Sequence, residues 1–106
     1  MVDEQTIQGI VNTIVTRLRP RRVILFGSHA RGQARDDSDL DLFVELDAPL
    51  PARGRTARVK QLFDPYPCPM DVVVYTPQEV EYWKQAAASL VASVLKEGRV
   101  LYERGR

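Results

Sequence analysis

The sequence predicts a small α/β (α+β) domain, built from one mixed β-sheet of about four strands with helices packed mainly on one face. Apolar residues recur with helical spacing near the N-terminus and again after residue 76, and short runs rich in β-branched residues lie between them. Such alternation is typical of helices layered against a sheet. A chain of 106 residues suits one domain, and we expect residues 1–106 to form it.

The N-terminal segment predicts a helix followed by a buried strand. Within residues 4–18 the apolar side chains repeat at i, i+3, i+4, i+7 and i+8, which makes one stripe along a helix. Asp3 is a suitable N-cap, and Pro20 ends the helix because it has no N–H group to donate. Residues 22–26 are apolar and rich in β-branched side chains, and Gly27 ends this predicted strand.

The middle of the chain predicts a second strand and a stiff connector. Residues 30–34 are expected to form a brief helical turn, and residues 40–44 alternate as a strand does. We expect a loop over residues 48–52 and a modest helix over residues 53–63. The prolines of residues 65–69 exclude a helix interior or a central strand there.

The C-terminal part predicts a strand and a long helix. Residues 70–75 have the highest β-propensity in the chain. Thr76 and Glu79 have the spacing of a capping box, with proline at the first helical position. The elements expected next are one continuous helix to about Lys96, a stop at Gly98 and a short strand over residues 100–102.

The apolar residues of that long helix are expected to be mostly core. The stripe that helical spacing predicts comprises Val80, Trp83, Ala87, Leu90, Val91 and Val94. Tyr82, Ala86 and Ala88 fall outside it. These three are consistent either with a partner interface or with simple helix propensity.

Composition and charge exclude several classes of function. The net charge of +1 argues against a protein that coats nucleic acid, so no direct nucleic-acid binding is expected. No apolar run approaches the roughly 18 residues that a membrane-spanning helix needs, and no secretory signal is readable. Cys68 is the single cysteine, which excludes an internal disulfide. We expect a cytoplasmic protein with no membrane contact.

Carboxylates gather in one short stretch of the chain. Six of the 14 acidic residues lie within residues 36–47, where like charges repel unless a cation compensates them. Asp39 and Asp41 point to the same side of the predicted strand, about 7 Å apart. Asp71 lies between two apolar residues of a later strand, which is unfavourable for an unpaired carboxylate. We expect Asp39, Asp41 and Asp71 to be the catalytic residues and the ligands of two Mg²⁺ ions.

The turn after the first strand predicts a phosphate-binding segment. Gly27 lets the backbone turn sharply and approach a ligand, with N–H groups toward phosphate oxygens. Ser28 adds a hydroxyl donor, and Arg31 can neutralise phosphate charge. Ser38 is expected to cap or orient the turn before the acidic strand. We expect Gly27, Ser28, Arg31 and Ser38 to bind the nucleotide.

Each of these features also has a plainer interpretation. A Gly-Ser turn between a strand and a helix is common without any ligand. A P-loop is excluded, because Gln33 and Ala34 stand where Lys and Ser or Thr would be needed. Asp36 and Asp37 are expected to be a solvated turn. His29 is an alternative general base, although Asp71 is better placed.

The run from Gly27 to Leu42, GSHARGQARDDSDLDL, resembles the signature of the DNA polymerase β-like nucleotidyltransferases. The short chain and the Ala-Arg-Gly-x-Ala-Arg segment resemble the minimal nucleotidyltransferase branch. The resemblance implies one such domain over residues 1–106 and transfer of AMP from ATP to a hydroxyl. In that family two Asp and a later strand Asp bind Mg²⁺, and Gly-Ser holds the ATP triphosphate. The matching positions are Asp39, Asp41, Asp71, Gly27 and Ser28.

The resemblance also implies a partner. Minimal nucleotidyltransferases are typically paired with an all-helical HEPN protein as the antitoxin of a type VII-like toxin–antitoxin module, and some transfer AMP to a tyrosine of that toxin. A hetero-oligomer with a HEPN protein is therefore expected. Two other functions remain open: the catalytic subunit of a small-molecule nucleotidyltransferase, such as an aminoglycoside-modifying enzyme, and a non-catalytic antitoxin that neutralises its partner by binding.

Overall fold

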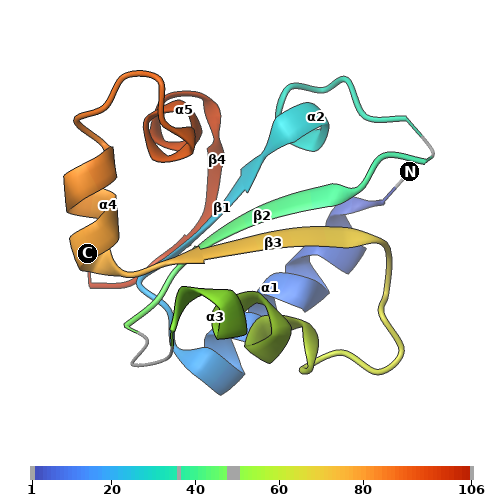
Figure 1. The fold of residues 1–106 in the computed structure, drawn as a ribbon. Helices are drawn as coiled ribbons and strands as arrows, with labels where there is room; N and C mark the ends of the chain where they lie inside the picture. Colours follow the sequence, from blue (N-terminus) through green and yellow to red (C-terminus); the bar gives the residue numbers. More distant parts are fainter. Residues whose placement is uncertain (1, 36, 48–50, 106) are drawn as a thin grey trace.

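The computed structural model describes residues 2–35, 37–47 and 51–105, in which four strands form one sheet with helices on both faces (Figure 1). The helices are α1 (Glu4–Leu18), α2 (Gly27–Ala30), α3 (Ala52–Lys60), α4 (Pro77–Trp83) and α5 (Leu90–Glu97). The strands are β1 (Arg22–Phe26), β2 (Leu40–Glu45), β3 (Met70–Tyr75) and β4 (Arg99–Glu103). The predicted small α+β domain with a mixed four-stranded sheet is confirmed.

The order of the strands brings one end of β1 to the start of β2 and β3. Across the sheet the order is β3-β2-β1-β4. β1 is antiparallel to both β2 and β4, whereas β2 and β3 are parallel. The register pairs Phe26 with Asp41 and Asp41 with Asp71. Residues that are distant in the chain therefore form one row across three adjacent strands.

Two cores lie on opposite faces of the sheet. The larger one packs beneath α1 and α3 and includes Leu40, Leu42 and Val44, the alternate residues of β2. The smaller one lies between the sheet and the helices α4 and α5, and comprises Ile24, Phe43, Val80, Val91 and Val94. Most of the helical packing is thus on one face, and the second face is only partly covered (Figure 1).

Local hydrogen bonds begin the helices where the sequence predicts. The Asp3 carboxylate accepts from the Thr6 backbone N–H at 2.8 Å and caps α1. The predicted capping box of α4 is present, because the Thr76 hydroxyl accepts from the Glu79 N–H at 3.2 Å and the Glu79 carboxylate accepts from the Thr76 N–H at 2.8 Å. Arg55 of α3 also donates to that carboxylate at 2.6 Å, which ties α3 to α4.

The continuous helix predicted up to Lys96 is wrong. α4 ends at Trp83, and α5 begins at Leu90 after a new N-cap at Ser89. The Ser89 hydroxyl accepts from the Ala92 N–H at 3.0 Å and donates to the Trp83 carbonyl at 2.7 Å. The break lets both short helices turn apolar residues toward the same small core. It also leaves Trp83 44% exposed and Leu90 40% exposed, although both residues belong to the stripe that was predicted to lie in the core.

Some smaller boundaries also differ from the prediction. The helical turn expected over residues 30–34 lies instead at Gly27–Ala30, directly after β1, because the left-handed Gly27 lets the chain turn at once. α3 covers Ala52–Lys60 and not residues 53–63. The loop expected over residues 48–52 lies partly outside the described residues, as does Asp36.

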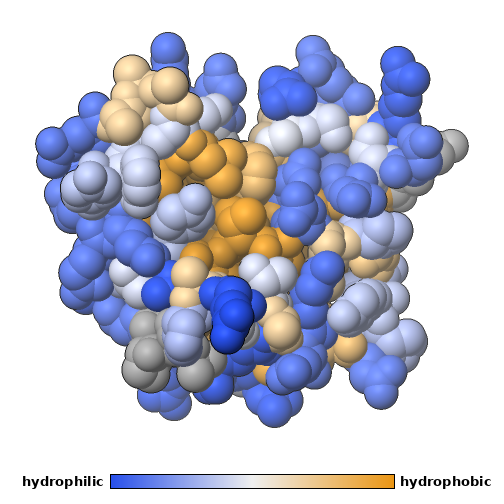
Figure 2. Space-filling view, in the orientation of Figure 1, coloured by the Kyte–Doolittle hydropathy of each residue, from blue (hydrophilic) through white to orange (hydrophobic). Residues whose placement is uncertain are grey.

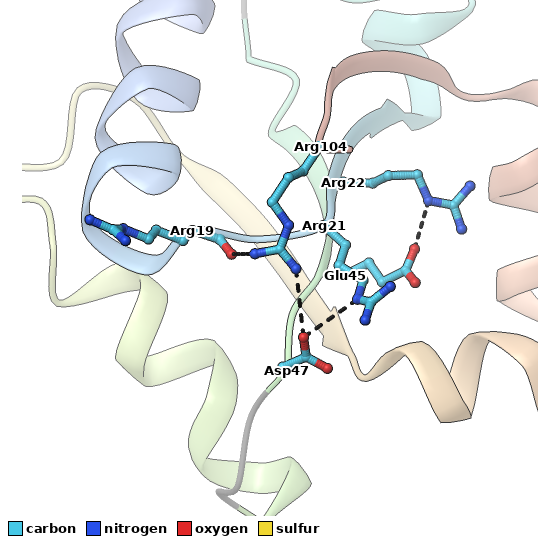
Figure 3. A network of polar contacts seen from close by, with 6 residues as sticks. All are labelled: Arg19, Arg21, Arg22, Glu45, Asp47 and Arg104. Atoms are coloured by element: carbon cyan, nitrogen blue, oxygen red, sulfur yellow. Dashed lines mark hydrogen bonds and ion pairs between the residues drawn. The ribbon is translucent and has the colours of Figure 1, made fainter. Parts of the chain in front are cut away.

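A group of arginines surrounds two carboxylates at the other end of β1 and β2 (Figure 3). Arg22 donates to Glu45 at 2.6 Å, and the Glu45 side chain is only 8% exposed. Asp47 lies 3.4 Å from Arg21 and 3.7 Å from Arg104 in exposed ion pairs. The charged side chains at this end of the sheet therefore pair with one another. No helix in the described part of the chain is long and apolar enough to cross a membrane.

Candidate active site

Two carboxylates lie side by side on the open face of the sheet. Asp41 of β2 and Asp71 of β3 are partners in the parallel register, and neighbouring strands lie about 4.8 Å apart. Both alternate with core residues of the α1 and α3 side, so both side chains point to the face that carries α4 and α5. Asp41 is partly buried and Asp71 is exposed. Asp39 lies one residue before β2 and is also exposed.

The pKa of Asp41 shows which charged side chains lie near its carboxylate. Burial raises the pKa of Asp41, and the negative charges of Asp71 and Asp39 raise it further. The nearby His29 and Arg31 act in the opposite direction on the pKa of Asp41. Asp39 and Asp71 therefore lie close enough for their charges to act on Asp41, and His29 and Arg31 lie near it as well.

Gly27 lies directly against the Asp41 carboxylate. Its φ of 73° is in the left-handed region, and a Cβ added there would overlap the carboxylate oxygen Oδ2 of Asp41. Only glycine fits this position without moving the acidic side chain. Ser28 follows at once and is partly buried. The glycine turn and the carboxylates thus form one contiguous site.

The turn that precedes Asp39 is held by local hydrogen bonds. The Ser38 hydroxyl accepts from the Arg35 N–H at 2.8 Å, and the Ser38 N–H donates to the Arg35 carbonyl at 3.0 Å. Nε2 of His29 lies 3.4 Å from the Ser38 carbonyl oxygen. Ser38 therefore orients the turn that carries Asp39, and its contact with a nucleotide stays a prediction.

The carboxylates of this site suit a metal ion that binds together with the nucleotide substrate. Within residues 2–35, 37–47 and 51–105, no three His, Cys, Asp or Glu side chains are grouped closely enough to hold a metal by themselves. Mg²⁺ prefers carboxylate oxygens and usually completes its shell with water and substrate phosphates. The carboxylates of Asp39, Asp41 and Asp71 fit that chemistry, with the nucleotide supplying further ligands.

Sequence reasoning missed the wall that faces the glycine turn. A cavity beside Gly27 is bounded on its other side by Leu90, Ser93 and Glu97 of α5. These three residues recur at i, i+3 and i+7, which places them on one face of the helix. Their spacing was readable from the sequence, but their position opposite Gly27 depends on how α5 packs on β1.

The fold and this site define an enzyme of nucleotidyl transfer. The chain belongs to the polymerase beta nucleotidyltransferase family, whose model matches residues 8–106.

Known proteins of similar sequence and structure agree with this family. A Methanocaldococcus jannaschii protein named "Putative protein adenylyltransferase MJ0604" is 33% identical over 106 residues, which cover 96% of this chain and 100% of that protein. A Sulfolobus solfataricus structure described as a putative nucleotidyltransferase has a TM-score of 0.66 at 19% identity, covering 94% of this chain and 79% of that one. A structure described as a toxin–antitoxin with AMP-PNP has a TM-score of 0.60 at 22% identity, covering 96% and 74%. The last two show the fold alone.

Proposed function

We propose that this enzyme transfers AMP from ATP to a protein hydroxyl in a Mg²⁺-dependent reaction, and that the acceptor is a tyrosine of an all-helical HEPN toxin. The observation that carries the proposal is the contiguous arrangement of Gly27, Asp41 and Asp71. The glycine turn offers a close backbone approach for phosphates, and the paired carboxylates offer oxygen ligands beside it.

Each site residue has a defined task in this reaction. Gly27 and Ser28 hold the triphosphate, and Arg31 neutralises part of its charge. Asp39, Asp41 and Asp71 hold Mg²⁺, which when bound stabilises negative charge on the phosphates and on the leaving pyrophosphate. Positioning of the nucleotide against the acceptor contributes the remaining acceleration.

The transfer breaks one bond and forms another at the α-phosphorus. The acceptor hydroxyl oxygen attacks the α-phosphorus, and the bond from that phosphorus to the bridging oxygen of the β-phosphate breaks. Pyrophosphate leaves with the electron pair of the broken bond. Asp71 is exposed on the open face and takes the hydroxyl proton, which it then passes to water.

Two observations support ATP as the donor and a protein as the acceptor. The Methanocaldococcus relative, whose name reads "Putative protein adenylyltransferase", is similar to this chain over its whole length. The toxin–antitoxin structure of similar fold holds AMP-PNP, an ATP analogue. Asp71 is exposed on the face of the sheet that carries α4 and α5, so the acceptor is expected to bring its own surface.

A labelling experiment tests the proposal. The chain is incubated with labelled ATP, Mg²⁺ and a candidate all-helical HEPN protein, and label and ribonuclease activity of that protein are both measured. We expect label on a tyrosine and loss of ribonuclease activity. Both effects should vanish in the double variant Asp39→Asn/Asp41→Asn and persist in the control Asp37→Asn, which removes an exposed carboxylate of the same turn.

Other outcomes distinguish the alternative functions. Neutralisation of the toxin that survives the double variant would show an antitoxin that acts by binding. Transfer to an aminoglycoside without any protein acceptor would show a small-molecule nucleotidyltransferase. Either result contradicts the proposed function.

A further inference from the structure

A cavity of about 280 Å³ opens between α2 and α5, next to the glycine turn. In Figure 2 apolar side chains gather in the hollow between these two helices, above the sheet. Phe26 lines the cavity from the end of β1, Gly27 and Arg31 from the two ends of α2, and Leu90 from α5. A mostly apolar cavity with a few polar groups is typical of a small-molecule site.

Besides Arg31, the polar side chains of this cavity come from one face of α5. Ser93 and Glu97 lie one turn apart, and both line the cavity. Among the described residues, the Glu97 side chain makes no hydrogen bond or ion pair. Its carboxylate can therefore accept a hydrogen bond from a ligand without giving up a contact within this part of the chain.

The wall that carries Glu97 is held firmly against the sheet. Gly98 follows α5 directly, and a Cβ added to it would lie 2.5 Å from Cγ2 of Ile24 in β1. The Gly98 N–H also donates to the Val94 carbonyl at 2.8 Å. Because the backbone at Gly98 touches β1 so closely, the distance between α5 and the glycine turn is set by packing and not by a flexible loop.

We infer that this cavity binds the adenine of ATP and that Glu97 selects it by accepting a hydrogen bond from the 6-amino group. The inference rests on the proposed function, which places the triphosphate at Gly27. Gly27 lines the cavity, and its backbone lies directly against the Asp41 carboxylate. A nucleotide whose phosphates lie at the carboxylates can therefore reach the cavity with its base.

The chemistry of the walls distinguishes the two purines. Phe26 and Leu90 offer apolar surface to the faces of a flat ring. Adenine presents an amino donor at position 6, which a carboxylate accepts, whereas guanine presents a carbonyl oxygen there, which a carboxylate repels. Glu97 is thus a specificity-determining residue, and adenine is the base that the cavity favours.

Binding measurements without an acceptor test the inference independently of catalysis. Dissociation constants for ATP, GTP and purine riboside triphosphate, which lacks the 6-amino group, are measured by calorimetry with Mg²⁺ present. We expect the wild type to bind ATP about 10-fold tighter than either analogue, because the lost hydrogen bond is charge-assisted. Glu97→Ala should bind ATP about 10-fold more weakly and should no longer distinguish it from purine riboside triphosphate.

The control is Glu81→Ala, which removes a carboxylate from α4, outside the residues that line the cavity. It should leave all three dissociation constants unchanged. Glu97 lies at the C-terminal end of α5, where a negative charge does not help the helix, so Glu97→Ala is expected to fold normally, with an unchanged circular dichroism melt.

Three results would overturn the inference. The first is equal binding of ATP and purine riboside triphosphate by the wild type, and the second is unchanged discrimination in Glu97→Ala. The third is a wild type that does not bind ATP. Adenine selectivity without AMP transfer would leave the inference intact and overturn only the proposed function. AMP transfer without discrimination between the bases would leave the proposed function intact and overturn the inference.

Discussion

Gly27 and the Asp41 carboxylate touch so closely that no other residue fits at position 27 without displacing the acidic group. Gly27→Ala should therefore combine left-handed strain of about 1 kcal/mol with a shifted Asp41, and should lower AMP transfer by at least about 100-fold. Activity assays and urea unfolding measure the two effects.

The matched control for that substitution is Gly32→Ala. Gly32 has a similar φ of 71°, but a Cβ added to it would meet nothing within 4 Å. It should therefore lose about the same 1 kcal/mol of unfolding free energy and keep most of its activity. Equal loss of activity in both variants would show that strain, and not the contact with Asp41, matters at position 27.

The ionised Asp41 side chain should lower the free energy of unfolding when no metal is present. Burial and the charges of Asp71 and Asp39 raise its pKa, which means that the ionised form is disfavoured in the folded chain. Asp41→Asn is expected to raise the unfolding free energy by about 0.5 kcal/mol at pH 7 while abolishing transfer. Chemical unfolding in a chelator measures this gain, and a loss of stability in Asp41→Asn would contradict it.

Glu79 links stability to pH. Burial alone would raise its pKa, but hydrogen bonds from Thr76 and Arg55 and the guanidinium charge outweigh that effect and lower it. A carboxyl whose folded pKa is lowered stabilises the protein above its unfolded pKa, about 4.3, and loses that contribution as the pH falls through the folded pKa. Glu79→Gln should cost about 1 kcal/mol at pH 7 and progressively less below pH 4.3.

Unfolding of the wild type and Glu79→Gln at several pH values checks this expectation. Glu81→Gln serves as the comparison, because Glu81 pairs with Lys84 in an exposed i,i+3 ion pair. It should change stability little at any pH. A difference between wild type and Glu79→Gln that stays constant down to pH 3 would exclude the ion pair as its cause.

Two of the ion pairs at the opposite end of β1 should contribute differently to stability. Arg22→Ala leaves the carboxylate of Glu45, 8% exposed, without the guanidinium that lies 2.6 Å away, and should lower the unfolding free energy by about 2 kcal/mol. Arg21→Ala breaks an exposed pair at 3.4 Å and should cost less than about 0.5 kcal/mol. Urea unfolding of both variants tests this ranking, and equal costs would show that burial of Glu45 has no effect.

Local periodicity and capping explain why so much of the fold was predictable. α1, the strands and the capping box of α4 depend on residues within a few positions of one another. The break after Trp83 was missed, because three consecutive alanines favour a continuous helix, whereas Ser89 caps a new helix and donates to the Trp83 carbonyl. The signal was present, since Ser89 is a good N-cap residue.

The candidate site was predictable to a different degree. The spacing of Asp39 and Asp41 placed them on one side of β2, but the pairing of Asp41 with Asp71 requires a parallel register that no local pattern contains. The contact between Gly27 and Asp41 and the α5 wall opposite Gly27 depend in the same way on strand order and helix packing. Chemistry was readable from residue types, whereas the shape of the site required the fold.

The origin of the transferred group tests the central proposal most directly. The chain, Mg²⁺ and the proposed helical partner are incubated in parallel with ATP labelled at the α-phosphate and ATP labelled at the γ-phosphate. An adenylyltransferase predicts that the partner acquires the α label alone and that the γ label appears in pyrophosphate. Transfer of the γ label to the partner, or label on neither protein nor pyrophosphate, would contradict the account.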